Sequence, residues 1–171
     1  GIVREPDRFE RPAVGPWVYE QQQLGFNYRI TDIQAALGLS QLQRLDQVVV
    51  ERNRQLQRYQ ELLTHLPVEL LKVPDDVLSS VHLAVIRLQQ ATAAQHRQVF
   101  EGLRGAGIGV QLHYSSVHLQ PYYRALGFVE DQFPEAEAYA SSAISLPLFP
   151  GLEIHEQQKV SRTLSNLLSQ I

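Results

Sequence analysis

Residues 25–66 read GFNYRITDIQAALGLSQLQRLDQVVVERNRQLQRYQELLTHL and contain no proline. Thr31 is a suitable N-cap for a helix, because its hydroxyl can accept a hydrogen bond from an amide of the first turn. Gln34 stands three residues later, where its side chain can bond back to the amide of the cap. The stretch therefore predicts a long helical segment over 31–66 that starts at Thr31.

Apolar or small side chains recur through this segment in alternating steps of three and four residues, as on one face of a helix. Arg52 is the one polar residue in the series, which comprises residues 35, 38, 42, 45, 49, 52, 56, 59, 63 and 66. A single straight helix of this length would span about 50 Å at about 1.5 Å per residue, too long for the core of a small domain. We therefore expect either a bend near Arg44 to Asp46 or a partner chain along the stripe.

Asn27, Tyr28 and Arg29 stand just ahead of this expected helix start. Backbone amides and the helix dipole favour anions at such a place, and an amide and a guanidinium add donors for a phosphate group. In a second interpretation, Asn27 and Arg29 merely tie a loop to the helix. The tripeptide alone favours the second interpretation, because short motifs are weak signals.

The chain has 171 residues, a net charge of −3 and no cysteine. This length suits about one domain, and there is no apolar run of the roughly 20 residues that a membrane span requires. The slight negative charge and scattered arginines argue against a nucleic-acid surface. Without cysteine there is no disulfide, thiolate metal site or cysteine nucleophile, and a cytoplasmic protein is expected by default. Because the chain begins with Gly and contains no methionine, we expect a piece of a longer protein.

The remaining sequence predicts an irregular arm over 1–30 and a small α+β domain over 67–171. Strands are expected within ELLKV, SSVHLAVIRL and IGVQLHY, and SLPLFPG is expected to be extended. Thr92 and Gln95 form a second capping pair, for a helix that Gly105 or Gly107 ends. Pro121 and Pro134 each begin a short helix, and a final helix starts near His155. The strands on either side of the helix that follows Thr92 are expected to lie side by side.

The densest group of polar and aromatic residues is HYSSVHLQPYY, residues 113–123, at the end of the strand expected in IGVQLHY. Strand ends commonly carry binding sites, so this loop predicts hydrogen bonds to a polar, hydroxylated ligand. An equal alternative places Tyr122 and Tyr123 in the core and leaves the histidines solvated. A zinc hydrolase site on His113 and His118 is disfavoured, because no third ligand stands at a recognisable spacing.

Three segments resemble, in this order and spacing, the C-terminal half of the DegT/DnrJ/EryC1/StrS nucleotide-sugar aminotransferases. They are GFNYRITDIQAALGLSQLQRLD, HYSSVHLQPYY and FPEAEAYASSAISLPLFPGL. The resemblance covers essentially the whole chain and, within the family, is strongest to the branch that serves pseudaminic acid biosynthesis. It implies the C-terminal small domain of a fold type I transferase that depends on pyridoxal 5′-phosphate (PLP), with a small sheet flanked by helices and led by a long helical arm.

The same resemblance implies a homodimer in which glutamate donates an amino group that PLP passes to the C4 keto group of a UDP-linked 4-keto-6-deoxy sugar. It implies that Asn27 reaches the cofactor phosphate of the partner subunit, and that Arg29 lies beside the phosphates of cofactor or nucleotide. His113 and Tyr114, together with His118, would line the sugar site. The functional interpretation of Asn27 and Arg29 is therefore preferred.

Two features depart from the family. The family's Schiff-base lysine belongs to a large domain that is absent here, and the lysines present, Lys72 and Lys159, lack its motif. We therefore expect the isolated chain neither to bind PLP nor to transaminate. Ser115 and Ser116 stand where the family usually has a residue followed by proline, which bears on the rigidity and sugar preference of the loop.

An alternative of another class is a self-associating helical interaction module without catalytic activity. In that case the apolar stripe from Ala35 to Leu66 would bury itself against a second copy of the chain, and no small molecule would bind.

Overall fold

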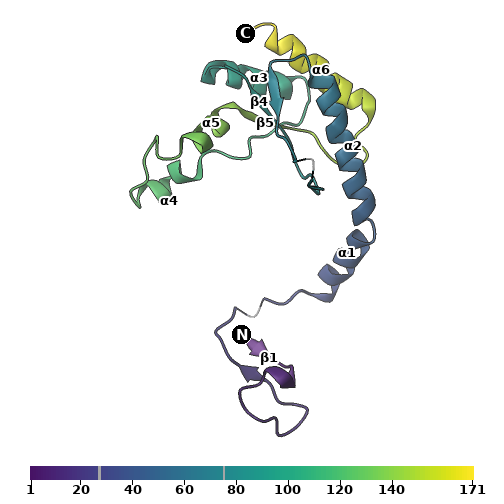
Figure 1. Ribbon diagram of the computed structural model, residues 1–171, viewed down its shortest axis with the longest axis vertical. Helices are drawn as coiled ribbons and strands as arrows, with labels where there is room; N and C mark the ends of the chain where they lie inside the picture. Colours follow the sequence, from purple (N-terminus) through teal and green to yellow (C-terminus); the bar gives the residue numbers. More distant parts are fainter. Residues whose placement is uncertain (27, 75) are drawn as a thin grey trace. The chain divides into compact units, whose positions relative to one another are not determined.

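The computed structural model describes residues 1–26, 28–74 and 76–171 (Figure 1). These residues form two compact units, Gly1–Arg44 and Leu45–Ile171. Asn27, one of the two residues expected to contact a phosphate group, lies outside the described residues.

The first unit opens with two short strands, β1 (Ile2–Val3) and β2 (Glu20–Gln21), which pair antiparallel and enclose the 3-10 turn η1 (Pro6–Arg8). Buried Glu20 holds the loop between the strands. Its carboxylate accepts hydrogen bonds from the backbone amides of Glu10 at 2.8 Å and Arg11 at 3.0 Å, and from the side-chain amide of Gln22 at 3.0 Å. The arm, expected to be irregular, therefore has local order around one carboxylate.

Helix α1 (Asp32–Leu42) completes the first unit and confirms the expected start. Thr31 accepts a hydrogen bond from the Gln34 amide at 3.3 Å, and the Gln34 side chain accepts one from the Thr31 amide at 3.0 Å. Apart from half-buried Ala35, all residues of α1 are exposed. The apolar face of this helix is thus uncovered.

The second unit begins with helix α2 (Leu45–Leu63), so Gln43 and Arg44 interrupt the helical segment beside the place where its length predicted a bend. In α2 the apolar stripe turns inward, with Leu56, Tyr59 and Leu63 buried. One half of the predicted stripe thus belongs to the core of this chain, and the other half is exposed on α1.

The sheet of the second unit has three antiparallel strands in the order β3 (Val68–Leu70), β4 (Ala84–Leu88) and β5 (Ala143–Leu146). The strand expected within residues 108–114 is wrong, since only Gln111 forms a bridge, and its partner is Ser145 of β5. Strand β4 already has β3 on one edge and β5 on the other. It therefore offers no free edge to the segment after the next helix.

Helices α3 (Ala93–Gly105) and α6 (Ile154–Leu168) complete the core, and α6 packs against both α2 and α3 (Figure 1). The capping pair Thr92 and Gln95 is confirmed. After α3 the chain turns at Gly107, which has a φ of 74°. The Gly107 amide bonds to the Arg104 carbonyl and the Ile108 amide to the Leu103 carbonyl, which is the Schellman pattern of a helix end.

One side of α2 holds the loop that follows β5. Glu51, Gln55 and Tyr59 recur every four residues and therefore share one helix face. They bond respectively to the Gly151 amide at 2.7 Å, the Phe149 carbonyl at 2.9 Å and the Pro147 carbonyl at 3.0 Å. This contact fixes the path between β5 and α6.

The segment from Leu112 to Ser142 carries η2 (Val117–Leu119), α4 (Pro121–Arg124) and α5 (Pro134–Ser142). Both proline starts are confirmed, because proline suits the first helical turn. The part with α4 projects away from the sheet, in green in Figure 1. Within the described ranges, no helix has both the length and the apolar character needed to cross a bilayer.

Candidate functional site

His113 joins the polar loop to the sheet. Its Nδ1 lies 2.9 Å from the Ser145 hydroxyl of β5, and its backbone carbonyl accepts a hydrogen bond of 3.1 Å from the Tyr139 hydroxyl of α5. Strand and helix thus fix both the ring and the backbone of His113. Neither contact was visible in the sequence, because the partners lie 32 and 26 residues away.

Tyr114 is the most open of the predicted sugar-site residues, with 70% of its surface exposed. Its ring stands edge-on to that of His113, with centroids 4.9 Å apart. Because His113 is anchored to β5 and α5, the exposed ring of Tyr114 rests on a fixed support. A phenol in this setting can stack on a ligand and hydrogen-bond to it.

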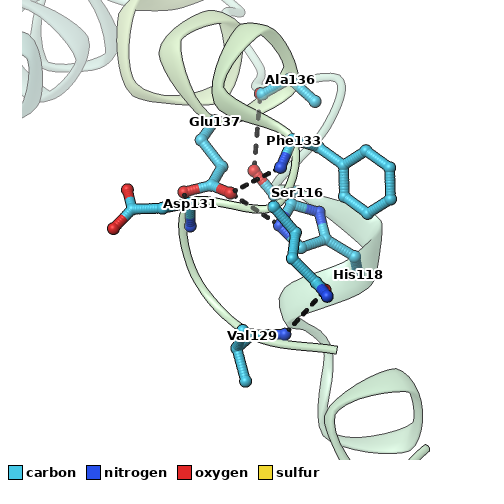
Figure 2. Close-up of polar contacts among 8 residues, drawn as sticks. Ser116, His118, Val129, Asp131, Phe133, Ala136 and Glu137 are labelled. Carbon is cyan, nitrogen blue, oxygen red and sulfur yellow. Dashed lines mark hydrogen bonds and ion pairs between the residues drawn. The ribbon is translucent and has the colours of Figure 1, made fainter. Parts of the chain in front are cut away.

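His118 lies in a different environment, with only 8% of its surface exposed. Its Nε2 is 2.8 Å from an oxygen of Glu137, and its ring packs edge-on against Phe133 at 4.9 Å. Figure 2 shows the imidazole enclosed between these side chains. The alternative in which the loop histidines are solvated is therefore wrong for His118.

Glu137 was not recognised in the sequence. Besides His118, its carboxylate accepts hydrogen bonds from the backbone amides of Asp131 at 3.1 Å and Phe133 at 3.4 Å (Figure 2). The Asp131 amide is the leading cause of the lowered pKa of Glu137, with His118 contributing against the opposing effect of burial. The available signal was the acidic residue one turn into a proline-started helix, where a carboxylate can reach back to amides at the helix start.

Tyr122 and Tyr123 are not core residues. The alternative that placed these two tyrosines in the core is therefore wrong. Tyr122 is 71% exposed, and Tyr123 is also exposed. Their rings instead begin a chain of aromatic contacts that passes through Phe128 to Phe133. These contacts support the projecting segment near α4, because aromatic pairs add packing energy beyond their buried area.

In the first unit, Arg29 lines a cleft of about 590 Å³ together with Phe26 and Tyr28. The rings of Phe26 and Tyr28 stack with centroids 5.3 Å apart, and both are exposed. The cleft lies just ahead of the capped start of α1. A guanidinium in this place suits a phosphate group.

Both the segment that carries Arg29 and the loop that carries Tyr114 lie within a match to a known protein family. Residues 9–165 match the sequence profile of the DegT/DnrJ/EryC1/StrS aminotransferase family. The chain belongs to this family. The match includes the capped helix start, the loop that carries His113 and Tyr114, and α5.

Among curated relatives of this chain, the spore coat polysaccharide biosynthesis protein SpsC of Bacillus subtilis (strain 168) is 32% identical over 158 residues. The alignment covers 90% of this chain but 41% of SpsC. The chain therefore spans about two fifths of the length of this relative.

Solved structures of sugar aminotransferases share the fold. Spr1654 from Streptococcus pneumoniae, assigned as a sugar aminotransferase and solved in its PMP form, superposes with a TM-score of 0.84 at 28% identity over 92% of this chain and 40% of its own. PseC of Helicobacter pylori, an aminotransferase of pseudaminic acid biosynthesis, has a TM-score of 0.81 at 26% identity over 91% and 42%. The α+β fold is thus that of a part of these enzymes.

PLP-dependent enzymes hold the cofactor through a lysine, so the surroundings of the lysines in this chain are of interest. Lys72 follows β3 and Lys159 lies on α6, and both side chains are exposed. Among the described residues, no three His, Cys, Asp or Glu side chains gather as metal ligands would. Arg29 in the first unit suits a contact to a phosphate, and the exposed Tyr114 in the second unit suits a contact to a polar ligand.

Proposed function

We propose that this chain is the C-terminal part of a PLP-dependent aminotransferase that moves an amino group from glutamate to the C4 keto group of a UDP-linked 4-keto-6-deoxy sugar. The family match over residues 9–165 carries the proposal. The likeness to PseC supports a role in nucleotide-sugar biosynthesis of the pseudaminic acid type. The likeness to SpsC supports polysaccharide biosynthesis more generally.

In this proposal, Asn27 contacts the cofactor phosphate in the partner subunit of a homodimer, and Arg29 lies beside the phosphates of cofactor or nucleotide. The exposed guanidinium of Arg29 lines a cleft ahead of a capped helix, a combination of donors that favours phosphate. The uncovered apolar face of α1 supports a dimer contact, because such faces mark interaction sites. The exposed arm and α1 would then contribute to a site shared between subunits.

His113 and Tyr114 line the sugar pocket. Tyr114 offers an exposed phenol for stacking on the sugar or hydrogen bonding to its hydroxyls, and the fixed ring of His113 supports it. Bound PLP supplies the group that accepts the amino group from one substrate and releases it to the other. This chain would bind and orient the sugar and the phosphate groups, while a lysine outside it would hold the cofactor. The isolated chain would therefore not transaminate.

The direct test is transamination by the full-length protein. The purified protein, loaded with PLP, should form 2-oxoglutarate from glutamate and convert a UDP-4-keto-6-deoxy sugar to its 4-amino product, detected by mass spectrometry. The isolated 171-residue chain is the matched control and should show neither product. Failure of the full-length protein to aminate any UDP-4-keto sugar would contradict the proposal.

The second candidate is a self-associating helical module without catalytic activity. The apolar side chains of α1 are exposed, for example Ile33 with 84% and Leu37 with 62% of its surface. They favour this candidate as much as the enzyme, because both would cover these side chains with a second copy of the chain. The two candidates differ in the full-length protein. An interaction module would associate but leave glutamate and the keto sugar unchanged.

A further inference from the structure

Helix α5 anchors the loop over residues 113–118 through three side-chain contacts. The Tyr139 hydroxyl donates to the His113 carbonyl at 3.1 Å, and the Ser116 hydroxyl donates to the Ala136 carbonyl at 3.5 Å. Glu137 completes the set with its 2.8 Å contact to His118. The beginning, middle and end of the loop therefore each bond to the same helix.

Glu137 forms the most extensive of these contacts, because its carboxylate also binds a second segment. The amides of Asp131 and Phe133 both donate to it, which closes the turn that leads into α5 (Figure 2). Asp131 has a φ of 66°, in the left-handed region that residues other than glycine rarely adopt. The bond to Glu137 therefore helps to hold a locally unfavourable backbone conformation.

His118 cannot both keep this environment and extend toward a ligand. Its Nε2 faces Glu137, its ring edge packs against Phe133, and little of its surface is open. Tyr114, four residues earlier on the same loop, is largely exposed. The loop is thus anchored in the protein by the buried His118 and presents Tyr114 to solvent, where it can contact a ligand.

We infer that Glu137 is a positioning residue for the sugar-site loop, holding the buried ring of His118 and thereby the loop that presents Tyr114 to the nucleotide sugar. His118 then holds the loop in place from its buried side and does not contact the substrate. This inference rests on the proposed function for the identity of the ligand. The contacts that it uses lie wholly within the second unit.

Removal of the carboxylate would leave three donors without their acceptor, namely His118 Nε2 and the amides of Asp131 and Phe133. A donor without a partner is costly on the buried ring of His118, so the loop would move to find another acceptor, whereas the amides of Asp131 and Phe133 lie at exposed positions and can bond to water. A glutamine in place of Glu137 keeps one oxygen that can accept from an amide, but it lacks the charge. Glu137→Gln should therefore lie between wild type and Glu137→Ala.

The kinetic test uses the full-length protein loaded with PLP and measures the two half-reactions separately. Glu137→Ala should raise the KM for the UDP-4-keto sugar by about tenfold, comparable with the loss of one good hydrogen bond. The single-turnover reaction with glutamate, followed by cofactor absorbance, should stay close to wild type. Glu135→Gln, an exposed carboxylate on the same helix, is the matched control and should change neither reaction.

A double-mutant cycle distinguishes positioning through His118 from a separate effect of each residue. If Glu137 acts through His118, the variants Glu137→Ala and His118→Ala should impair the sugar reaction to a similar extent, and the double variant no more than either. Additive losses would overturn the inference. So would a glutamate reaction that falls as much as the sugar reaction, because that result would indicate general destabilisation.

Hydrogen exchange of the same full-length proteins gives a readout that does not depend on catalysis. Amides of residues 113–133 should exchange faster in Glu137→Ala than in wild type, while those of α3 and α6 keep their protection. Unchanged exchange in 113–133 would overturn the inference. If wild type fails to aminate a sugar, the proposed function is wrong, and the exchange result alone decides whether Glu137 holds the loop.

Discussion

The side-chain amide of Gln55 donates a hydrogen bond of 2.9 Å to the backbone carbonyl of Phe149, 94 residues further along the chain. Gln55 is buried in α2, so this bond joins the first helix of the second unit to the loop after β5. Gln55→Ala should lower the free energy of unfolding by about 1 to 3 kcal/mol, because it removes the donor to the Phe149 carbonyl and to the buried carbonyl of Leu152. Chemical denaturation measures this loss. The neighbouring Arg54→Ala, at an exposed position, should change stability by less than about 0.5 kcal/mol.

Gly105 and Gly107 should respond in opposite directions to the same substitution. Gly105 is the last residue of α3 and an added Cβ would meet nothing within 4 Å, so Gly105→Ala should stabilise the chain by up to about 0.5 to 1 kcal/mol. Gly107 has a φ of 74°, so Gly107→Ala should cost about 1 to 2 kcal/mol. Thermal unfolding of the two variants should show Tm shifts of opposite sign. Equal shifts would contradict the Schellman ending.

Acidic pH should loosen the arm by protonating Glu20. The hydrogen bond from Gln22, followed by those from the amides of Glu10 and Arg11, lowers the pKa of Glu20 in the folded arm. The ionised carboxylate therefore stabilises the arm above the pKa of an unfolded glutamate, and this stabilisation is lost as the pH falls through the lowered pKa of the folded arm. Amide NMR shifts of Glu10 and Arg11 should follow this transition. In Glu20→Gln they should not change over the same pH range.

The exposed face of α1 should drive association of the isolated chain. Ile33 and Leu37 are four residues apart and therefore adjacent on one face. Replacing both with glutamate should shift sedimentation toward the monomer, because charged side chains resist burial. Gln41→Glu, which adds a charge at a polar position of the same helix, is the control. Association unchanged by the double substitution would mean that another surface forms the contact.

Local features of this fold were predictable from the sequence. The capping pairs at Thr31 and Thr92 depend on residues three positions apart, and the starts at Pro121 and Pro134 depend on one fixed φ. The break in the helical segment followed from length alone. Such signals lie within one or two turns of chain, so a single sequence contains them.

Features that depend on distant partners were not predictable. The expected strand after α3 was wrong because β3 and β5 occupy both edges of β4, a pairing that local pattern does not reveal. The same holds for the loop, where the contact between His118 and Glu137 joins residues 19 positions apart. The sequence pointed to this loop as a candidate site but not to which of its side chains faces inward.

The affinity of the full-length protein for PLP tests most directly whether Asn27 and Arg29 hold a cofactor phosphate. Asn27→Ala and Arg29→Ala should each weaken PLP binding by roughly ten- to a hundredfold, as expected for lost hydrogen bonds to a charged group. Titration of the apoenzyme, followed by cofactor absorbance, gives the dissociation constant. Wild-type affinity in both variants would contradict the assignment of this segment as a phosphate contact.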